Sequence, residues 1–196
     1  MPPPSTRWSA EAAVDWYERQ AWLCGFNYLP CTAINWIELW QAETFDAATI
    51  EQELAWAGAV GFTTLRTNLH SLVWQQDPAG LRARLDRFLK IAARHGLRTM
   101  LCLFDDCGFS GLPSRLGAQG DPVPGVHNSG ACASPGRAVV REPAGWAALE
   151  RYVGDLVGHF RDDARIVVWD LYNEPGNNGD PSAGATSRAA PTRSPG

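Results

Sequence analysis

The chain has 196 residues, 45% of them hydrophobic, which is enough to bury the core of one domain. Its formal net charge is −4 and it contains no basic tract, so neither nucleic acid nor an anionic membrane is an expected partner. It also lacks an apolar run of about 18 residues or more, so no membrane-spanning helix is expected.

Short apolar segments alternate with longer amphipathic ones from the start of the chain. The elements expected in the first part are a helix over residues 10–20, a strand over residues 22–27, an aromatic loop over residues 28–45, a helix after residue 46 and a strand over residues 62–66. Asp46 or Thr49 is expected to cap the second helix, because a short polar side chain there can accept the first free backbone N–H groups. Gly58 and Gly61 are expected to end it.

The second part of the chain continues this alternation. It predicts a helix opened by Pro78 and ended at Gly96, a strand over residues 98–104, a loop over residues 105–142, a helix that includes residues 149–160 and a strand over residues 165–172. A loop longer than about 12–15 residues is usually either functional or disordered, and both interpretations stay open for this one. Residues 182–196 lack apolar periodicity and are expected to be a disordered, low-complexity tail.

The architecture follows from this order of elements. Strands that are apolar on both faces and separated by helices indicate a parallel sheet covered by helices, either an open doubly wound sheet or a closed barrel. The first strand lacks the G-x-G-x-x-G motif of an open dinucleotide-binding sheet, and polar, aromatic segments follow the strands, as on the active face of a barrel. We therefore predict an α/β protein with the (β/α)8 TIM-barrel fold, limited to about the first four βα units. Residues 1–20 are expected to form an extension and helix, and residues 21–181 the half barrel.

The segment Trp169-Asp-Leu-Tyr-Asn-Glu-Pro175 carries the strongest chemical signal. It places an amide and a carboxylate at the carboxyl end of an apolar strand, where a proline ends the strand. Glycoside cleavage needs a protonated carboxyl near the leaving oxygen, a second carboxylate across the sugar, and donors for the 2-hydroxyl. Glu174 is therefore a candidate acid/base residue and Asn173 a candidate substrate ligand. The alternative is a surface glutamate in a turn at the end of a strand.

The same segment resembles the strand-four signature of clan A glycoside hydrolases, the cellulase, mannanase and β-glycosidase group, whose Asn-Glu-Pro supplies a substrate-binding Asn and the acid/base Glu. Other segments resemble one bacterial branch described as cellulase-like or 1,4-β-xylanase-like: Gly25-Phe-Asn-Tyr28, the aromatic loop, Gly61-Phe-Thr-Thr-Leu-Arg66, Leu103-Phe-Asp-Asp106 and Pro124-Gly-Val-His-Asn-Ser129. The resemblance covers about residues 20–180, the first half of the family fold. It implies a (β/α)8 barrel, a carbohydrate substrate with β-linkages and a retaining double displacement.

The resemblance also implies roles for individual residues. Arg66 ends the second strand, where clan A enzymes have an arginine bonded to the nucleophilic carboxylate; a surface arginine is the alternative. Asp105 and Asp106 can line the cleft or cap the loop, and the family's strand-three histidine is not matched here. The remaining candidates are two tryptophans that either stack on sugar or belong to the core, Trp36 and Trp40, and four polar residues that either bond sugar hydroxyls or have loop or packing roles, Asn27, His70, His127 and Asn128.

The nucleophile of clan A enzymes lies on the seventh strand, beyond the four strands expected here, and no Asp or Glu of this chain takes its place. One hypothesis is therefore a glycosidase that is inactive as this truncated chain. A second is a carbohydrate-binding remnant without catalysis, and a third is a half barrel that pairs with a copy of itself or with a separate half. Open sheet edges would favour such self-association.

The cysteines and the start of the chain bear on compartment and cofactors. The five cysteines are odd in number and have no CxxC spacing, which favours reduced thiols over a disulfide framework or a metal site. Cys132 stands where the family would have an aromatic residue. The first residues lack the apolar segment of a secretory signal, so a cytoplasmic protein without metal or cofactor is expected, although family members are often secreted.

Overall fold

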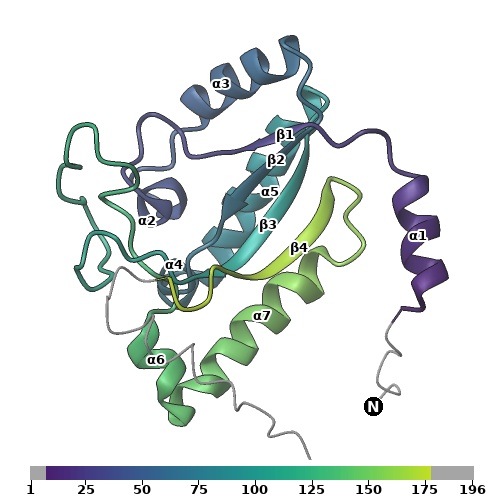
Figure 1. The fold of residues 1–196 in the computed structure, drawn as a ribbon. Helices are drawn as coiled ribbons and strands as arrows, with labels where there is room; N and C mark the ends of the chain where they lie inside the picture. The colour runs from purple at the N-terminus through teal and green to yellow at the C-terminus, as the bar shows by residue number, and fades with distance from the viewer. Residues whose placement is uncertain (1–7, 178–196) are drawn as a thin grey trace, which may run out of the picture.

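The computed structural model describes residues 8–177 (Figure 1). Its elements, in chain order, are α1 (Ala10–Glu18), β1 (Gly25–Asn27), α2 (Trp36–Trp40), α3 (Ala47–Ala59), β2 (Thr64–Asn68), α4 (Ser71–Gln76), α5 (Pro78–Arg94), β3 (Arg98–Asp105), α6 (Arg137–Arg141), the 3₁₀ turn η1 (Pro143–Gly145), α7 (Trp146–Phe160) and β4 (Ile166–Asn173). The residues expected to form the disordered tail, 182–196, lie outside the described range. Among the described helices none is long and apolar enough to cross a bilayer.

The four strands form one parallel sheet in the order β1-β2-β3-β4. Gly25 allows β1 to approach β2 closely, since a Cβ atom there would lie 2.3 Å from the Oγ1 of Thr64 and 2.8 Å from its carbonyl oxygen. The predicted α/β class with a parallel sheet is confirmed. Consecutive strand order is also the order of the first four strands of a (β/α)8 barrel.

The apolar core lies between the sheet and its helices. The strands contribute Leu65, Leu101 and Leu103, each at most 1% exposed, and α3, α5 and α7 cover them with Leu54, Leu85, Phe88, Leu89 and Leu156. Helices α3 and α5 begin as their sequences predict: Asp46 accepts the N–H groups of Ala48 and Thr49, and Pro78 stands in the first turn of α5. Helix α5 is followed by Gly96 at φ +74°, the conformation expected just past a helix end.

On β2, the face opposite this core carries polar side chains. The backbone of β2 alternates, so Leu65 and Thr67 point one way and Thr64, Arg66 and Asn68 the other. Pairing aligns Asn27 with Arg66 and Asp105 with Asn173, so polar residues from all four strands lie at the carboxyl-end edge. The loops that follow β1 and β3 gather at this edge beside α2, whereas α1 lies on the other side of the molecule (Figure 1).

The structure differs from the predicted elements in the first connection. Strand β1 covers three residues, because Trp22 is 80% exposed and pairing with β2 as a strand starts only at Gly25. The predicted aromatic loop contains the helix α2, capped by the Asn35 carboxamide oxygen, which accepts the N–H groups of Ile37 and Glu38. Helix α4, which follows β2 almost directly, was not predicted.

The long loop after β3 is ordered by hydrogen bonds to α2 and its flanks. Asn35 donates to the carbonyl oxygen of Gly130 at 3.0 Å, and Glu38 accepts the backbone N–H of Gln119 at 2.8 Å. The side-chain carbonyl of Gln41 accepts the N–H of Gly117 at 2.9 Å. Loops this long are usually functional or disordered, and these contacts argue against disorder.

Candidate functional site

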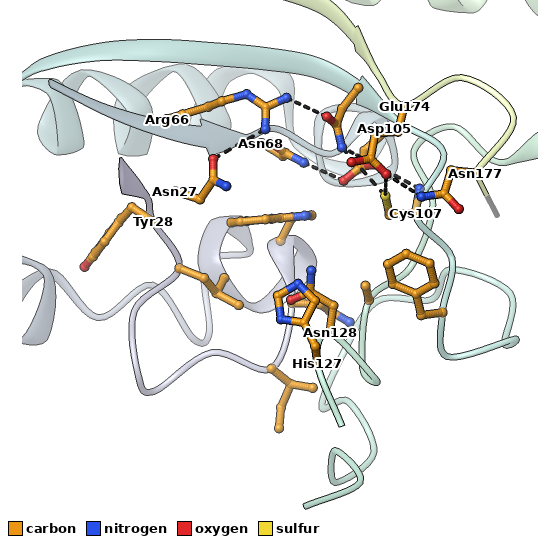
Figure 2. Close-up of a pocket in the computed structure, with 17 residues that line it drawn as sticks. Asn27, Tyr28, Arg66, Asn68, Asp105, Cys107, His127, Asn128, Glu174 and Asn177 are labelled. Atoms are coloured by element: carbon orange, nitrogen blue, oxygen red, sulfur yellow. Dashed lines mark hydrogen bonds between the residues drawn. The ribbon is translucent and has the colours of Figure 1, made fainter. Parts of the chain in front are cut away.

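A cavity of about 530 Å³ opens at the carboxyl ends of the strands (Figure 2). Side chains at the strand ends form one wall, and side chains from the segment after β1, from α2 and from the long loop form the other. The strand-end wall contains Asn27, Arg66, Asn68, Asp105, Cys107, Asn173, Glu174 and Asn177. The facing wall includes Tyr28, Leu29, Ile34, Trp36, Phe109, His127 and Asn128. One wall is thus polar and charged, and the other is mainly apolar and aromatic.

Arg66 connects β1, β2 and β4 within the polar wall. Its guanidinium donates to Asp170 Oδ2 at 2.6 Å and to Asn173 Oδ1 at 2.8 Å, and more weakly to Asn27 Oδ1 at 3.5 Å. A partly buried guanidinium needs a counter-charge, and Asp170 supplies it. The Asn173 oxygen is thereby fixed towards Arg66, so its amino group must point the other way.

Asp105 is the buried carboxylate of the site, with 3% of its surface exposed. It accepts hydrogen bonds from Asn68 Nδ2 at 2.5 Å, from Asn173 Nδ2 at 3.0 Å and from the backbone N–H of Cys107 at 2.9 Å. Both carboxylate oxygens are therefore engaged. Asp105 fixes the amide of Asn173 in its orientation rather than presenting a free oxygen to the cavity.

Glu174 is the exposed carboxylate of the site, and its backbone is strained. Its φ is +45°, a left-handed conformation that costs a residue other than glycine about 1–3 kcal/mol and that often marks functional positions. Its Oε2 accepts hydrogen bonds from the Asn177 amide and from the Cys107 thiol, the latter at 3.3 Å. These two bonds, aided by the positive charge of Arg66 and opposed by slight burial, lower the pKa of Glu174. The carboxyl is therefore ionised at neutral pH.

Cys107 lies between the two carboxylates and is 6% exposed. Burial raises the pKa of its thiol, and hydrogen bonding and charge from Asp105 and then Glu174 raise it further. The thiol therefore stays protonated and acts as a neutral hydrogen-bond donor. All five cysteines of the chain are free thiols. Within residues 8–177 no group of three or more His, Cys, Asp or Glu side chains is arranged to bind a metal ion.

The structure brings most of the predicted site residues to this one cavity. They are Asn27, Trp36, Arg66, Asp105, His127, Asn128, Asn173 and Glu174. His127 and Asn128 come from the long loop and face the strand ends across the cavity (Figure 2). Trp36 is partly exposed at the start of α2, where its indole ring borders the open space.

Three predicted residues do not line this cavity. The prediction of Trp40 as a sugar platform is wrong: Trp40 is 0% exposed, packs on Phe88 and Phe45, and donates its indole N–H to the carbonyl oxygen of Asn68 at 2.7 Å. It is a core residue, and no ligand can reach its ring.

His70 and Asp106 belong to a different part of the molecule. His70 is 1% exposed, and its Nδ1 caps α4 by accepting the N–H of Leu72 at 3.2 Å. Asp106 accepts the N–H of Gly176 at 2.6 Å and lies 3.7 Å from Arg137. Both border a second cavity, on the far side of the loop that starts at Cys107. Asp106 points away from the first cavity because its neighbour Asp105 lines it, and adjacent side chains at a strand end point in opposite directions. His70 is held away from the first cavity by its cap on α4.

Sequence reasoning missed several residues of the polar wall. Asn68 stands two positions after Arg66 on the same strand, so the period of two in β2 was a usable signal. Cys107 stands two positions after Asp105, beyond the end of β3, where no strand period applies. Asn177 follows the turn at Glu174, and nothing in the sequence pattern pointed to it.

No protein-family model and no curated protein matches this chain. Among solved structures it is similar to GH5_18 from Streptomyces cattleya, crystallised in complex with GlcNAc, with 19% sequence identity and a TM-score of 0.48. The match covers 77% of this chain and 34% of that protein, so the chain spans about a third of its length. A similarity of this size does not identify a family or an activity.

Proposed function

We propose that this cavity binds a carbohydrate and that Glu174 is the acid/base carboxylate of a glycoside hydrolase site. The observation that carries the proposal is the cavity at the carboxyl ends of a parallel sheet, where Glu174, Asn173 and Arg66 meet opposite an aromatic wall. The carboxyl ends of the strands are also where (β/α)8 barrel enzymes have their active sites.

The two unlike walls match the two kinds of surface on a sugar ring. A pyranose has hydroxyl groups around its edge and apolar C–H groups on its faces. Asn27, Arg66 and Asn173 offer donors and acceptors to the hydroxyls, while Trp36 and Phe109 offer ring surface to the apolar face. A volume of about 530 Å³ lies within the range of about 300–1,000 Å³ common for small-molecule sites.

Proton transfer by Glu174 depends on its protonation state. A lowered pKa leaves Glu174 ionised and suited to accept a proton from water. Donation to a leaving oxygen requires a higher pKa, which a bound sugar produces by displacing water, and which a second carboxylate nearby also produces. The described residues offer no free second carboxylate, since Asp105 is fully bonded and Asp170 is paired with Arg66. We therefore expect the 196-residue chain to bind sugar without efficient turnover.

Binding is the first test. Isothermal titration and NMR with cello-, xylo- and manno-oligosaccharides measure affinity for the wild-type chain, for Trp36→Ala and for Trp56→Ala, a matched control whose side chain is 63% exposed on α3. We expect Trp36→Ala to weaken binding about fivefold or more, because removing an aromatic ring from under a stacked nucleic-acid base costs roughly 1–3 kcal/mol, and a sugar face stacks on the ring in the same way. Equal effects of the two substitutions, or no binding by the wild type, would contradict the proposal.

Chemical rescue tests the role of Glu174. Azide or formate supplied with an aryl β-glycoside can take the place of the missing carboxylate, attack the anomeric carbon and release the phenol. We expect this anion-dependent reaction in the wild type, and loss of about 10²–10⁴-fold in Glu174→Gln, the range of general acid–base catalysis. The Trp36→Ala variant, which is expected to bind sugar weakly, should lose the anion-dependent reaction as well.

Carbohydrate binding without catalysis is the second candidate function. It is favoured by the lowered pKa of Glu174 and by the complete bonding of Asp105. Sugar binding that depends on Trp36, together with no anion-dependent cleavage, would select this function over hydrolysis.

A further inference from the structure

Cys107 contacts both Glu174 and the buried Asp105. Its backbone N–H donates to Asp105 Oδ1 at 2.9 Å, and its thiol donates to Glu174 Oε2 at 3.3 Å. The Asn173 amino group lies 3.7 Å from the same sulfur. Cys107 is buried yet borders the cavity, so its sulfur lies between the inner and the outer carboxylate of the site (Figure 2).

This surrounding suits a hydrogen-bond donor and not a nucleophile. Two carboxylates and burial keep the proton on the sulfur, so the thiolate needed for nucleophilic attack is suppressed. A thiol has one proton to donate. When Glu174 is ionised, its Oε2 accepts the hydrogen bond from that thiol. When Glu174 is protonated, Asp105 is the remaining anionic acceptor beside the sulfur, because its three accepted hydrogen bonds leave one of about four lone pairs unused.

We propose that Cys107 is a positioning residue whose S–H donates to Glu174 while that carboxylate is ionised and turns to Asp105 once Glu174 gains a proton. The sulfur keeps its proton throughout, and no covalent bond forms or breaks. This gives the site a donor that follows the protonation state of Glu174, which a group that alternates between base and acid requires. Its catalytic significance rests on the proposed function; the hydrogen bond itself does not.

Other groups also act on Glu174 and remain in every variant. They are the Asn177 amide from the following turn and the Arg66 charge from β2. The Asp105 carboxylate from β3 acts on the Cys107 thiol. His127 faces the strand ends from the far wall (Figure 2). A test must therefore isolate the thiol, which substitution by alanine and by serine does, since serine retains a donor of similar size.

The test is a ¹³C NMR titration of the Glu174 carboxyl in the full chain, assigned with Glu174→Gln. We expect Cys107→Ala to raise the pKa of Glu174 towards its ordinary value, because a donor to the ionised form is lost. Cys107→Ser should keep the pKa below that value, and Cys132→Ser, at another buried cysteine of the same loop, should leave it as in the wild type. An unchanged pKa in a folded Cys107→Ala would overturn the inference.

A second readout needs no loss of the thiol. The infrared S–H band of Cys107, isolated as wild type minus Cys107→Ser, should shift as Glu174 titrates and should lose that shift in Glu174→Gln. A band that does not respond to pH in the wild type would equally overturn the inference, even if Cys107→Ala fails to fold. Both readouts are independent of sugar binding and turnover, so failure of the proposed function leaves their result intact, and the reverse also holds.

Discussion

Strands β3 and β4 have the same length and a similar apolar character, yet they lie in different surroundings. Five of the last seven residues of β3 are apolar or cysteine, and from Leu101 onwards every residue is buried. No residue of β4 is buried, and Leu171 in its middle is 60% exposed. Strand β3 pairs with β2 and β4, whereas β4 pairs only with β3 among the described strands.

This difference shows that the apolar sequence of β4 is not explained by the contacts it makes here. A strand with Ile166, Trp169 and Leu171 has the composition of an interior strand of a parallel sheet and the position of an edge. Edge strands in natural proteins are usually short or charged, because an open backbone edge invites pairing. The comparison therefore predicts that β3 contributes much to the free energy of unfolding and β4 little. It also predicts that β4, unlike β3, favours association with another chain.

The largest effect is expected in the core. Leu101→Ala in β3 removes a side chain that is 0% exposed and should lower the free energy of unfolding by about 2–5 kcal/mol. Leu171→Ala in β4 should lower it by less than about 0.5 kcal/mol, since little burial is lost. Urea unfolding of both variants measures the difference. Equal losses would mean that β4 is buried in solution by a partner chain.

The next effect is a pH dependence at the end of the inner strand β2. Burial lowers the pKa of His70 to about 4, partly offset by a hydrogen bond with Ala133. The unfolded chain binds the proton at a higher pH, so stability is complete above about pH 6.5 and falls as the pH approaches 4. From pH 7 to pH 5 the loss should be about 2 kcal/mol. Urea unfolding at both pH values should show it in the wild type, and His70→Asn should remove most of it.

A smaller effect is expected where β4 is tied to β2 by a charged contact. Asp170→Asn removes the partner of Arg66, whose side chain is 22% exposed, and should cost about 1 kcal/mol. Asp162→Asn, in an ion pair with Arg161 that is 86% and 73% exposed, is the matched control and should cost less than about 0.5 kcal/mol. Thermal melts compare the two. If Asp170→Asn leaves the melting temperature unchanged, Arg66 does not need this counter-charge.

The smallest effect on stability is expected for a substitution in β4 that changes self-association. Leu171→Lys places a charge on the open edge and should leave the free energy of unfolding within about 0.5 kcal/mol of the wild type. It should reduce self-association at high protein concentration, measured by sedimentation velocity. Val60→Lys, at a position 75% exposed after α3, controls for added charge. A wild-type chain that stays monomeric at all concentrations would contradict the expectation.

The fold and part of the site could be predicted from the sequence, because apolar residues repeat with the period of each element and characteristic residues mark where elements begin and end. The apolar positions of α5 repeat at helical spacing, and its start at Pro78 and end before Gly96 are marked by residue type. Asn173 follows from its position at the end of β4, since parallel strands bring their carboxyl ends to one edge. Arg66 was expected to end the second strand, but β2 continues to Asn68, so Arg66 reaches the site from within the strand.

The errors came from directions that no local pattern determines. Trp36 and Trp40 stand one helical turn apart on α2, which was expected to be a loop; the first borders the cavity and the second lies a turn deeper in the core. Asp105 and Asp106 are adjacent, so only one can face the cavity, and the sequence did not indicate which. That choice depends on where β3 ends, and strand boundaries are the least determined feature of a sequence pattern.

The left-handed backbone at Glu174 means that selection for stability and selection for catalysis would favour different residues at this position. Asparagine and glycine adopt φ near +45° more easily than glutamate does, so replacing Glu174 by asparagine should relieve about 1 kcal/mol of strain. A library of chains varied at position 174 and sorted for folding alone would therefore accumulate asparagine or glycine. The same library sorted for sugar cleavage, in a barrel completed by a second carboxylate, would retain glutamate. A comparison of the two enrichments would measure how much stability the protein gives up to keep the proposed acid/base residue at that turn.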